Sequence, residues 1–555
     1  MKKGEFFEGI IETVDFPNKG RVYIDNQMIT VKNGIPKQKI KGLINKKKGS
    51  RLEARLMEII EKSPLETEAP VCKNFPACGG CMYQTMNYSD QLEMKKTQVK
   101  ALLDAAIAGG GQVDGSGQPD YVFEGILGSP LQFGYRNKME FSFGDEYKDG
   151  PLSLGLHKKG STYDILTTDD CKIVHDDFTK ILITVLNYFK ENPASFYKKM
   201  QHTGWLRHLL VRRAQTSGEI LVNLVTTSQE SHDLAPLVSR ILALPLDGKI
   251  TGILHIINDS LADIVQSDET KILWGRDYFY ETILGLKFKI TPFSFFQTNS
   301  LGAEVLYSKA RDYVGDTKDQ VIFDLYSGTG TIAQILAPVA KKVIGVEIIA
   351  EAVTAAKENA GLNGLSNCEF IAGDVLKMLD TIKERPDFIV LDPPRDGIHP
   401  KALDKIIDYG VDRMVYISCK PTSLARDLEK LLECGYKVEK ACCVDMFPNT
   451  VHVETVVKLS KGEIDSKKVR VEFSLEDMNM SEFQNGATYT QIKDYVLEHS
   501  GMKVSSLYIA QVNQKCGIIE RENYNKPKSE DANQPQCPPE KEKAIMEAFE
   551  YFGMI

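Results

Sequence analysis

From residue 291 to residue 460, apolar strand-like runs alternate with helix-like segments, and this alternation constrains the fold more than any other feature of the chain. Strands separated by helices form parallel sheets, because the helix carries the chain back to the start of the next strand. We therefore predict an α/β fold. Ligands of such sheets bind in a crevice at the carboxyl ends of the strands. Four runs end on or near an acid that we expect to line that crevice: Asp324, Glu347, Asp374 and Asp392.

The turn after the first run is rich in glycine. Gly328 and Gly330 allow a tight turn and the close approach of a ligand to the backbone. Glu347 follows 23 residues after Asp324, a distance at which an acid can accept hydrogen bonds from ribose hydroxyls. The glycines do not complete the fingerprint for a pyrophosphate, and a sulfonium ligand suits a crevice lined by carboxylates. The pattern resembles a class I (Rossmann-like) S-adenosylmethionine-dependent methyltransferase more than a dehydrogenase.

Two further motifs restrict the chemistry of the crevice. Asp392 begins the sequence DPPR, in which Arg395 replaces the aromatic residue of amino-group methyltransferases, so the target should not be an exocyclic amine. Cys419 ends the next apolar run, beside the expected methyl donor. A thiolate that adds to carbon 6 of uracil makes carbon 5 reactive toward a sulfonium methyl, and a base must then remove the proton from carbon 5.

Each of these residues also has an ordinary structural interpretation. An isolated cysteine is most often an inert buried thiol, although the motifs around Cys419 argue against that here. Glu454 is a candidate for the base, and His452 shares its face of a strand because side chains alternate along strands. His452 is equally well explained as a supporting residue of the core.

The motifs together resemble the RNA uracil-5-methyltransferase family of the RumA/TrmA type. The resemblance rests on DLYSGTGTIA, LDPPRDG, YISCKPTSLARDL and VHVETVV, and on PFSFFQTN at residues 292–299. It implies that Cys419 is the nucleophile and Glu454 the proton-abstracting base. The residues expected to bind S-adenosylmethionine are Gln297, Tyr326, Glu347 and Asp392, with Asp374 added from its place at a strand end. Ser327 stands where many members have cysteine.

Four cysteines form a second candidate site. Cys72, Cys78 and Cys81 are closely spaced, and Cys171 is available farther along the chain. Four thiolates suit zinc or an iron–sulfur cluster, and the sequence lacks the paired C-x2-C elements that would favour zinc. The spacing is similar to the 4Fe–4S site of ribosomal-RNA members of the family, which transfer-RNA members generally lack. The resemblance therefore implies a 4Fe–4S cluster with a structural or RNA-binding role, and favours 23S ribosomal RNA as the substrate.

The other segments complete the expected domain plan. Residues 1–62 show short strand-like pieces between glycines and resemble a TRAM domain, an OB-like RNA-binding barrel. Residues 63–290 are expected to form a mixed α+β central domain with the four-cysteine site, residues 291–460 the methyltransferase domain, and residues 461–555 a small helical extension of unknown role. The barrel lysines expected to contact phosphates are Lys37, Lys39, Lys41, Lys46, Lys47 and Lys48.

RNA contacts are also expected in the central segment, although one sequence does not rank its basic residues. The candidates are Arg136, Lys138, Arg207, His208, Arg212 and Arg213. Trp205 is as consistent with the core as with a stacking platform. A helix near residues 89–106 should begin at a cap formed by Ser89 or Asp90.

The C-terminal extension predicts two helices joined by a turn at Gly501. Ser505 or Ser506 should cap the second helix. This pattern is compatible with a helix-turn-helix-like nucleic-acid module or with a helical docking domain. Cys516 and Cys537 show no metal spacing and are interpreted as ordinary thiols.

Charge and localisation fit this interpretation without deciding it. The net charge of −8 argues weakly against nucleic-acid binding, but residues 1–60 alone carry +6. The sequence shows no membrane segment and no signal peptide, so a cytoplasmic bacterial protein with reduced cysteines, acting as a monomer, is expected. The sequence therefore predicts a 23S ribosomal RNA uracil-5-methyltransferase. The alternatives are a transfer-RNA enzyme of the same type and a non-catalytic iron–sulfur RNA-binding protein.

Overall fold

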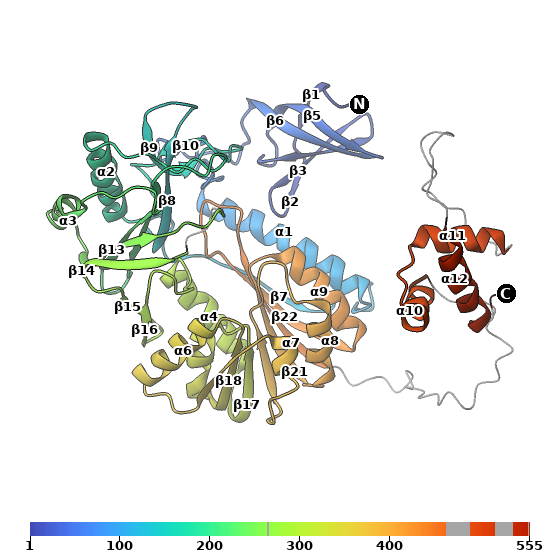
Figure 1. Ribbon diagram of the computed structural model, residues 1–555. Helices are drawn as coiled ribbons and strands as arrows, with labels where there is room; N and C mark the ends of the chain where they lie inside the picture. Colours follow the sequence, from blue (N-terminus) through green and yellow to red (C-terminus); the bar gives the residue numbers. More distant parts are fainter. Residues whose placement is uncertain (263–265, 462–488, 517–536, 553, 555) are drawn as a thin grey trace. The chain divides into compact units, whose positions relative to one another are not determined.

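The computed structural model describes residues 1–262, 266–461, 489–516, 537–552 and 554 (Figure 1). The chain divides into two compact units, Met1–Ile464 and Asp465–Ile555. Within the described ranges, every helix is too short or too polar to cross a membrane.

The first sixty residues form a six-stranded sheet in the order β1-β5-β6-β4-β3-β2. The sheet curls, so that β1 also lies against β3, and alternate side chains such as Ile29, Val31 and Ile40 fill its interior. The strands come close because Gly42 has no Cβ, which would lie 2.4 Å from the Phe7 ring. This curled sheet agrees with the predicted barrel. Its strands are β1 (Phe6–Ile10), β2 (Thr13–Asp15), β3 (Lys19–Ile24), β4 (Gln27–Lys32), β5 (Lys39–Lys48) and β6 (Arg51–Glu61).

A second sheet of seven strands follows, in the order β10-β9-β8-β11-β12-β13-β14. Helix α2 (Asp176–Glu191) packs against β9 and buries an apolar face that includes Phe178, Leu182 and Phe189. Its strands are β8 (Lys138–Asp145), β9 (Leu152–His157), β10 (Ile165–Thr167), β11 (Leu206–Arg213), β12 (Glu219–Thr226), β13 (Lys249–Ile257) and β14 (Glu269–Gly275). Helix α3 (Ala235–Leu242) and the hairpin of β15 (Phe279–Ile283) and β16 (Leu286–Ile290) complete this region.

The third sheet contains eight strands in the order β19-β18-β17-β20-β21-β23-β22-β7. Five of them are parallel and β23 runs antiparallel to β21, which confirms the α/β prediction. The strands are β17 (Thr317–Leu325), β18 (Ala340–Glu347), β19 (Cys368–Ala372), β20 (Phe388–Leu391), β21 (Arg413–Ser418), β22 (Tyr436–Val444) and β23 (Glu454–Lys461). The helices are α4 (Ser300–Val314), α5 (Thr331–Leu336), α6 (Ala350–Leu362), α7 (Val375–Met378), α8 (Pro400–Asp408) and α9 (Pro421–Glu433), with a 3-10 turn η1 (Ala337–Val339).

The eighth strand of this sheet comes from the segment predicted to form the central domain. Strand β7 (Val122–Leu127) pairs parallel with β22, and helix α1 (Tyr88–Gly109) packs against α9. An unpaired β22 would leave a row of free backbone groups at the sheet edge. Strand β7 therefore completes the eight-stranded sheet and α1 packs beside it, although both lie before the expected boundary at residue 290. Asn87, and not Ser89 or Asp90, caps α1 by accepting a hydrogen bond from the Asp90 amide.

Several residues considered for RNA contact are instead buried. Trp205 is 1% exposed and packs on the rings of Phe189 and His232, so it is a core residue. The Arg207 guanidinium is buried and donates hydrogen bonds to the carbonyls of Asn258, Ser260 and Ala262. The guanidinium thereby satisfies carbonyls of the segment that follows β13. His208 and Arg212 are buried as well, and Arg212 donates to the carbonyls of Thr291 and Ser294.

The C-terminal unit contains helices α10 (Tyr489–Ser500), α11 (Ser506–Lys515) and α12 (Pro539–Tyr551). Gly501 has a positive φ of +68°, which allows the turn between the first two helices. Ser505 caps α11 by accepting a hydrogen bond from the Tyr508 amide, as predicted. The helices enclose a small apolar core that includes Ile492, Ile509 and Phe549.

The burial of Arg207 leads to a prediction about stability. Arg207→Met should lower the free energy of unfolding by about 3 kcal/mol, because the buried carbonyl of Asn258 and the carbonyls of Ser260 and Ala262 lose a charged donor. The matched control is Arg240→Met, because Arg240 also lies over a tyrosine ring but is 44% exposed and pairs with Glu191 at the surface. Its cost should be below about 1 kcal/mol. Urea unfolding measures both, and equal losses would contradict the structural role of Arg207.

Candidate active site

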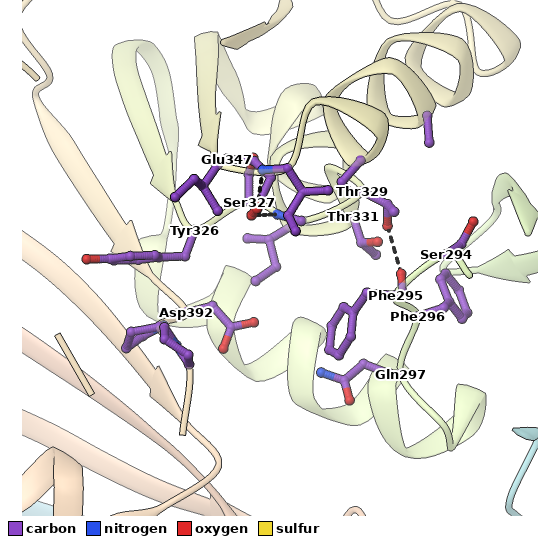
Figure 2. A pocket seen from close by; sticks show the side chains of 18 of the residues that line it. Ser294, Phe295, Phe296, Gln297, Tyr326, Ser327, Thr329, Thr331, Glu347 and Asp392 are labelled. Carbon is purple, nitrogen blue, oxygen red and sulfur yellow. Dashed lines mark hydrogen bonds between the residues drawn. The ribbon is translucent and has the colours of Figure 1, made fainter. Parts of the chain in front are cut away.

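A cavity of about 1470 Å³ opens at the carboxyl edge of the eight-stranded sheet. Its walls come from the segments that follow β17, β18, β20 and β21 and from the start of β23. Figure 2 shows Asp392, Gln297 and Phe295 around the same space. The lining includes the seven residues predicted for catalysis or cofactor binding: Gln297, Tyr326, Glu347, Asp374, Asp392, Cys419 and Glu454.

The glycine-rich turn after β17 is held by the carboxylate of Glu347. The backbone amides of Gly328 and Ile349 each donate a hydrogen bond of 3.0 Å to this carboxylate (Figure 2). Tyr326 and Gly330 have positive φ angles of 69° and 74°. A Cβ on Gly330 would lie 2.6 Å from the Phe370 ring, so the turn requires glycine there. Glu347 retains lone pairs that can accept hydrogen bonds from a ligand in the cavity.

Asp324 differs from the prediction that four acids line one crevice. Its side chain is fully buried below the turn, where the Ala333 amide donates to it at 2.9 Å, and it does not belong to the cavity lining. Burial and the negative charges of Asp392 and Glu347 raise the pKa of Asp324 to about 8. The cavity therefore holds the other three predicted acids, and Asp324 supports the turn from behind.

Asp392 directly follows β20 and is partly buried. Burial raises the pKa of Asp392 to about 7. A positively charged ligand in the cavity would stabilise the ionised carboxylate and lower this pKa. The site therefore favours a cation beside Asp392.

Cys419 and Glu454 are brought together by the pairing of β21 with β23. Ser418 pairs with Thr455 in the antiparallel register, so Cys419 and Glu454 are the next opposed positions at the open end of the two strands. Both line the cavity, with Asp392 in the same wall. A residue from the end of one strand and a residue from the start of another thus meet at one point.

Charges around the thiol decide its protonation. Burial and the carboxylates of Glu454 and Asp392 raise the pKa of Cys419 to about 11, while a hydrogen bond and the positive charge of Arg395 oppose this shift. Burial and Asp392 likewise raise the pKa of Glu454 to about 8. The thiol and the carboxyl group are therefore both mainly protonated near pH 7 until further positive charge enters the cavity.

Arg395 and His452 form a pair in the same wall. The Nη2 of Arg395 lies 3.0 Å from Nδ1 of His452. Burial and the charge of Arg395 lower the pKa of His452 to about 4, so the ring is neutral and Nδ1 accepts the hydrogen bond. His452 therefore orients the arginine that faces Cys419. The sequence singled out Arg395 only as the replacement of an aromatic residue.

Phe295 and Phe447 are among the aromatic residues of the cavity that were not predicted as site residues. Phe295 is 66% exposed, and Phe447 packs edge-on against His452. The carbonyl of Phe295 accepts a hydrogen bond from the Thr329 hydroxyl, which ties its loop to the glycine-rich turn. The sequence PFSFF contains Phe295, but one sequence does not show which of its phenylalanines are exposed and which belong to the core.

The four cysteines predicted to form a site also lie together. Cys72, Cys78, Cys81 and Cys171 line one small cavity with Gln84, and all four are free thiols. Burial raises the pKa of Cys81 to about 11 and that of Cys171 to about 12. Bound metal would lower the pKa values of these thiols, because a coordinated thiol is deprotonated.

Comparison with known proteins extends these observations. The family model described as tRNA (Uracil-5-)-methyltransferase matches residues 256–462. An uncharacterized RNA methyltransferase of Clostridium tetani is 50% identical over 463 residues, which cover 83% of this chain and 99% of that protein. A second uncharacterized RNA methyltransferase, from Caldanaerobacter subterraneus, is 47% identical over 462 residues, or 83% of this chain and all of that protein.

A solved structure agrees with the fold. The tRNA (uracil-54, C5)-methyltransferase of Pyrococcus abyssi, in complex with S-adenosyl-L-homocysteine, aligns with a TM-score of 0.63 and 26% identity over 82% of this chain and 100% of that one. The fold and the acid-lined cavity are those of an S-adenosylmethionine-dependent methyltransferase. This chain belongs to the RNA uracil-5-methyltransferase family.

The place of Glu347 leads to a prediction about cofactor affinity. Glu347→Gln should weaken S-adenosylhomocysteine binding at least tenfold, because it removes a charged acceptor and weakens the hydrogen bonds from the amides of Gly328 and Ile349. Glu358→Gln is the control, since Glu358 lines the outer wall and pairs with Lys289. Titration calorimetry compares the two variants. Equal affinities would show that Glu347 does not contact the ligand.

Proposed function

We propose that this protein methylates carbon 5 of a uridine in 23S ribosomal RNA through a covalent adduct between the base and Cys419. The observation that carries the chemistry is the strand register that places Cys419 beside Glu454 in the cavity with Asp392. A thiol and a carboxyl group at one point supply the nucleophile and the base that substitution at carbon 5 requires. Gln297, Tyr326, Glu347, Asp374 and Asp392 are the proposed contacts of S-adenosylmethionine.

The first half of the reaction uses Cys419. The thiol gives its proton to water, and the charge of Arg395 beside it stabilises the thiolate. The sulfur adds to carbon 6 of the uracil, and the electrons of the 5,6 double bond form an enolate. S-adenosylmethionine supplies an activated methyl group carried by a sulfonium. Carbon 5 of the enolate takes that methyl group, and S-adenosylhomocysteine is the product.

The second half uses Glu454. Its carboxylate removes the proton from carbon 5, the 5,6 double bond forms again, and the bond between carbon 6 and the Cys419 sulfur breaks. The raised pKa of Glu454 suits this step, because a more basic carboxylate is a stronger proton acceptor. A uridine within folded RNA must first leave its stack to reach Cys419.

We also propose that Cys72, Cys78, Cys81 and Cys171 hold a 4Fe–4S cluster. Four free thiols in one cavity fit such a group. The sequence lacks the paired C-x2-C elements that would favour a zinc ion. A cluster with a structural role requires no electron transfer in methylation.

The choice between two RNA classes depends on different observations. The four-cysteine site supports 23S ribosomal RNA through its similarity to ribosomal-RNA members of the family. Transfer RNA is the second candidate substrate, because the descriptions of the matching family model and of the aligned Pyrococcus abyssi enzyme both name tRNA.

Labelled methyl transfer separates these proposals. The purified protein is incubated with labelled S-adenosylmethionine and with unmodified ribosomal or transfer RNA, and the labelled nucleoside is identified. We expect 5-methyluridine in 23S ribosomal RNA, and no transfer with Cys419→Ala. Label in transfer RNA alone would establish the second candidate, and label on a nitrogen would refute the mechanism.

The two-step chemistry predicts a trapped intermediate. Glu454→Gln should still add Cys419 to the base and accept the methyl group, but should not remove the proton from carbon 5. The expected result is a covalent protein–RNA adduct that survives denaturing electrophoresis, with turnover reduced at least 100-fold. Cys419→Ala is the control and should give no adduct. A Glu454→Gln variant that turns over normally would assign the base role to another group.

The raised pKa values predict how activity depends on pH. A glutamate with a pKa of about 8 is roughly 1% ionised at pH 6 and half ionised at pH 8. At saturating RNA, kcat/KM for S-adenosylmethionine reports the ionisation of the enzyme before the cationic cofactor binds. This constant should rise more than tenfold between pH 6 and pH 8, and the raised pKa of Cys419 acts in the same direction. A flat profile over this range would show that neither group limits the reaction in its protonated form.

A further inference from the structure

Residues 445–453 connect β22 to β23 and border the cavity, and we call them the 445–453 loop. Phe447 and His452 from this loop line the cavity, and Glu454 follows it directly. Within the loop, Thr450 bonds to the Phe447 carbonyl and to the His452 amide. Most of the other hydrogen bonds of the loop go to distant segments of the chain.

One of these segments is the continuation of the cysteine motif. The amides of Met82 and Tyr83 donate hydrogen bonds of 2.7 and 3.2 Å to the carbonyl of Asn449. Cys81 directly precedes Met82, and Gln84 directly follows Tyr83. Cys81 and Gln84 both line the four-cysteine cavity, and Gln84 accepts a hydrogen bond from the Cys72 amide. A stretch of four residues thus joins the cysteine site to the loop.

Asn449 is held on all sides. Its amide donates to Oε1 of Gln91 at 2.9 Å, and Nε2 of Gln91 donates back to Oδ1 of Asn449 at 3.1 Å. Nδ2 of Asn449 donates to the Gln132 carbonyl. The residue is 3% exposed and has a φ of +66°, a conformation that asparagine tolerates better than most residues. Such complete pairing fixes the backbone of the loop at this residue.

A second anchor comes from the same helix as Gln91. Nζ of the buried Lys95 lies 2.7 Å from Oδ1 of Asp445 and 3.2 Å from the Phe447 carbonyl. The Tyr135 hydroxyl donates to the Pro448 carbonyl at 3.0 Å. The start of the loop is therefore tied to α1, and its middle is tied to the cysteine segment.

We propose that Asn449 is a positioning residue through which the four-cysteine site sets the place of His452 and Glu454. Ligation of Cys81 fixes Met82 and Tyr83, these amides fix Asn449, and Asn449 fixes the loop that ends at Glu454. The cysteine site then contributes to the reaction by positioning His452 and Glu454, without taking part in the chemistry. The inference rests on the proposed role of Glu454 as the base.

The first experiment uses Asn449→Gly in the full chain. Glycine keeps the positive φ and the carbonyl that Met82 and Tyr83 reach, and removes only the side chain. We expect kcat to fall at least tenfold with KM for RNA changed less than twofold, and the methylated covalent adduct to accumulate as in Glu454→Gln. Asp149→Gly is the matched control, because Asp149 also has a positive φ but lies in the exposed turn between β8 and β9. Wild-type kcat in Asn449→Gly would overturn the positioning role.

The second experiment measures the coupling without enzyme activity. Amide hydrogen exchange is followed in the full chain with and without the Cys81→Ser substitution, and with Gln91→Leu as a second variant that leaves the thiols intact. Both variants should accelerate exchange in the 445–453 loop at least tenfold and leave β11 and β12 unchanged. Unchanged exchange of the loop in Cys81→Ser, or global acceleration in both variants, would refute a specific coupling.

The outcomes separate this inference from the proposed function. If the wild-type protein forms no adduct with RNA and transfers no methyl group, the proposed function fails, and hydrogen exchange still decides whether the cysteine site holds the loop. If the wild-type protein is active while Asn449→Gly matches Asp149→Gly in every measurement, the positioning role fails alone.

Discussion

The antiparallel pairing of β21 with β23 is the constraint on which the rest of the site depends. In a sheet made only of parallel strands, the carboxyl edge presents strand ends alone. Here one strand runs the other way, so its first residue, Glu454, meets the last positions of β21 at that edge. The proposed nucleophile and base are therefore positioned by backbone hydrogen bonds of the sheet, and Cys419 needs no long loop to reach Glu454.

The same arrangement places several carboxylates in a dehydrated space. Asp392 and Glu454 each have a raised pKa because burial penalises their charge. Arg395, held by the neutral ring of His452, supplies positive charge within this wall. A cationic methyl donor would add to it. The cavity is thus electrostatically incomplete until its ligand binds, and binding itself shifts the acids and the thiol toward their reactive forms.

The sequence predicted the part of the site that depends on strand ends, because the end of an apolar run is visible in one sequence and the carboxyl edge follows from the fold. It did not predict that Asp324 lies beneath the turn or that Arg207 and Arg212 satisfy buried carbonyls. Those outcomes depend on which side of a strand faces the core and on distant loops, which periodicity does not specify. The place of β7 was also missed, since a single strand inserted across the chain leaves no local signal.

That inserted strand makes the catalytic region inseparable from what precedes it. The pairing of β7 with β22 joins residues more than 300 positions apart, so this edge of the sheet forms only after nearly the whole catalytic region has been synthesised. Non-local pairing of this kind slows folding. A fragment that begins at residue 291 would expose the edge of β22 and lack the helix that anchors Asp445. Evolutionary exchange of the catalytic region as an isolated cassette is therefore disfavoured by the topology of its own sheet.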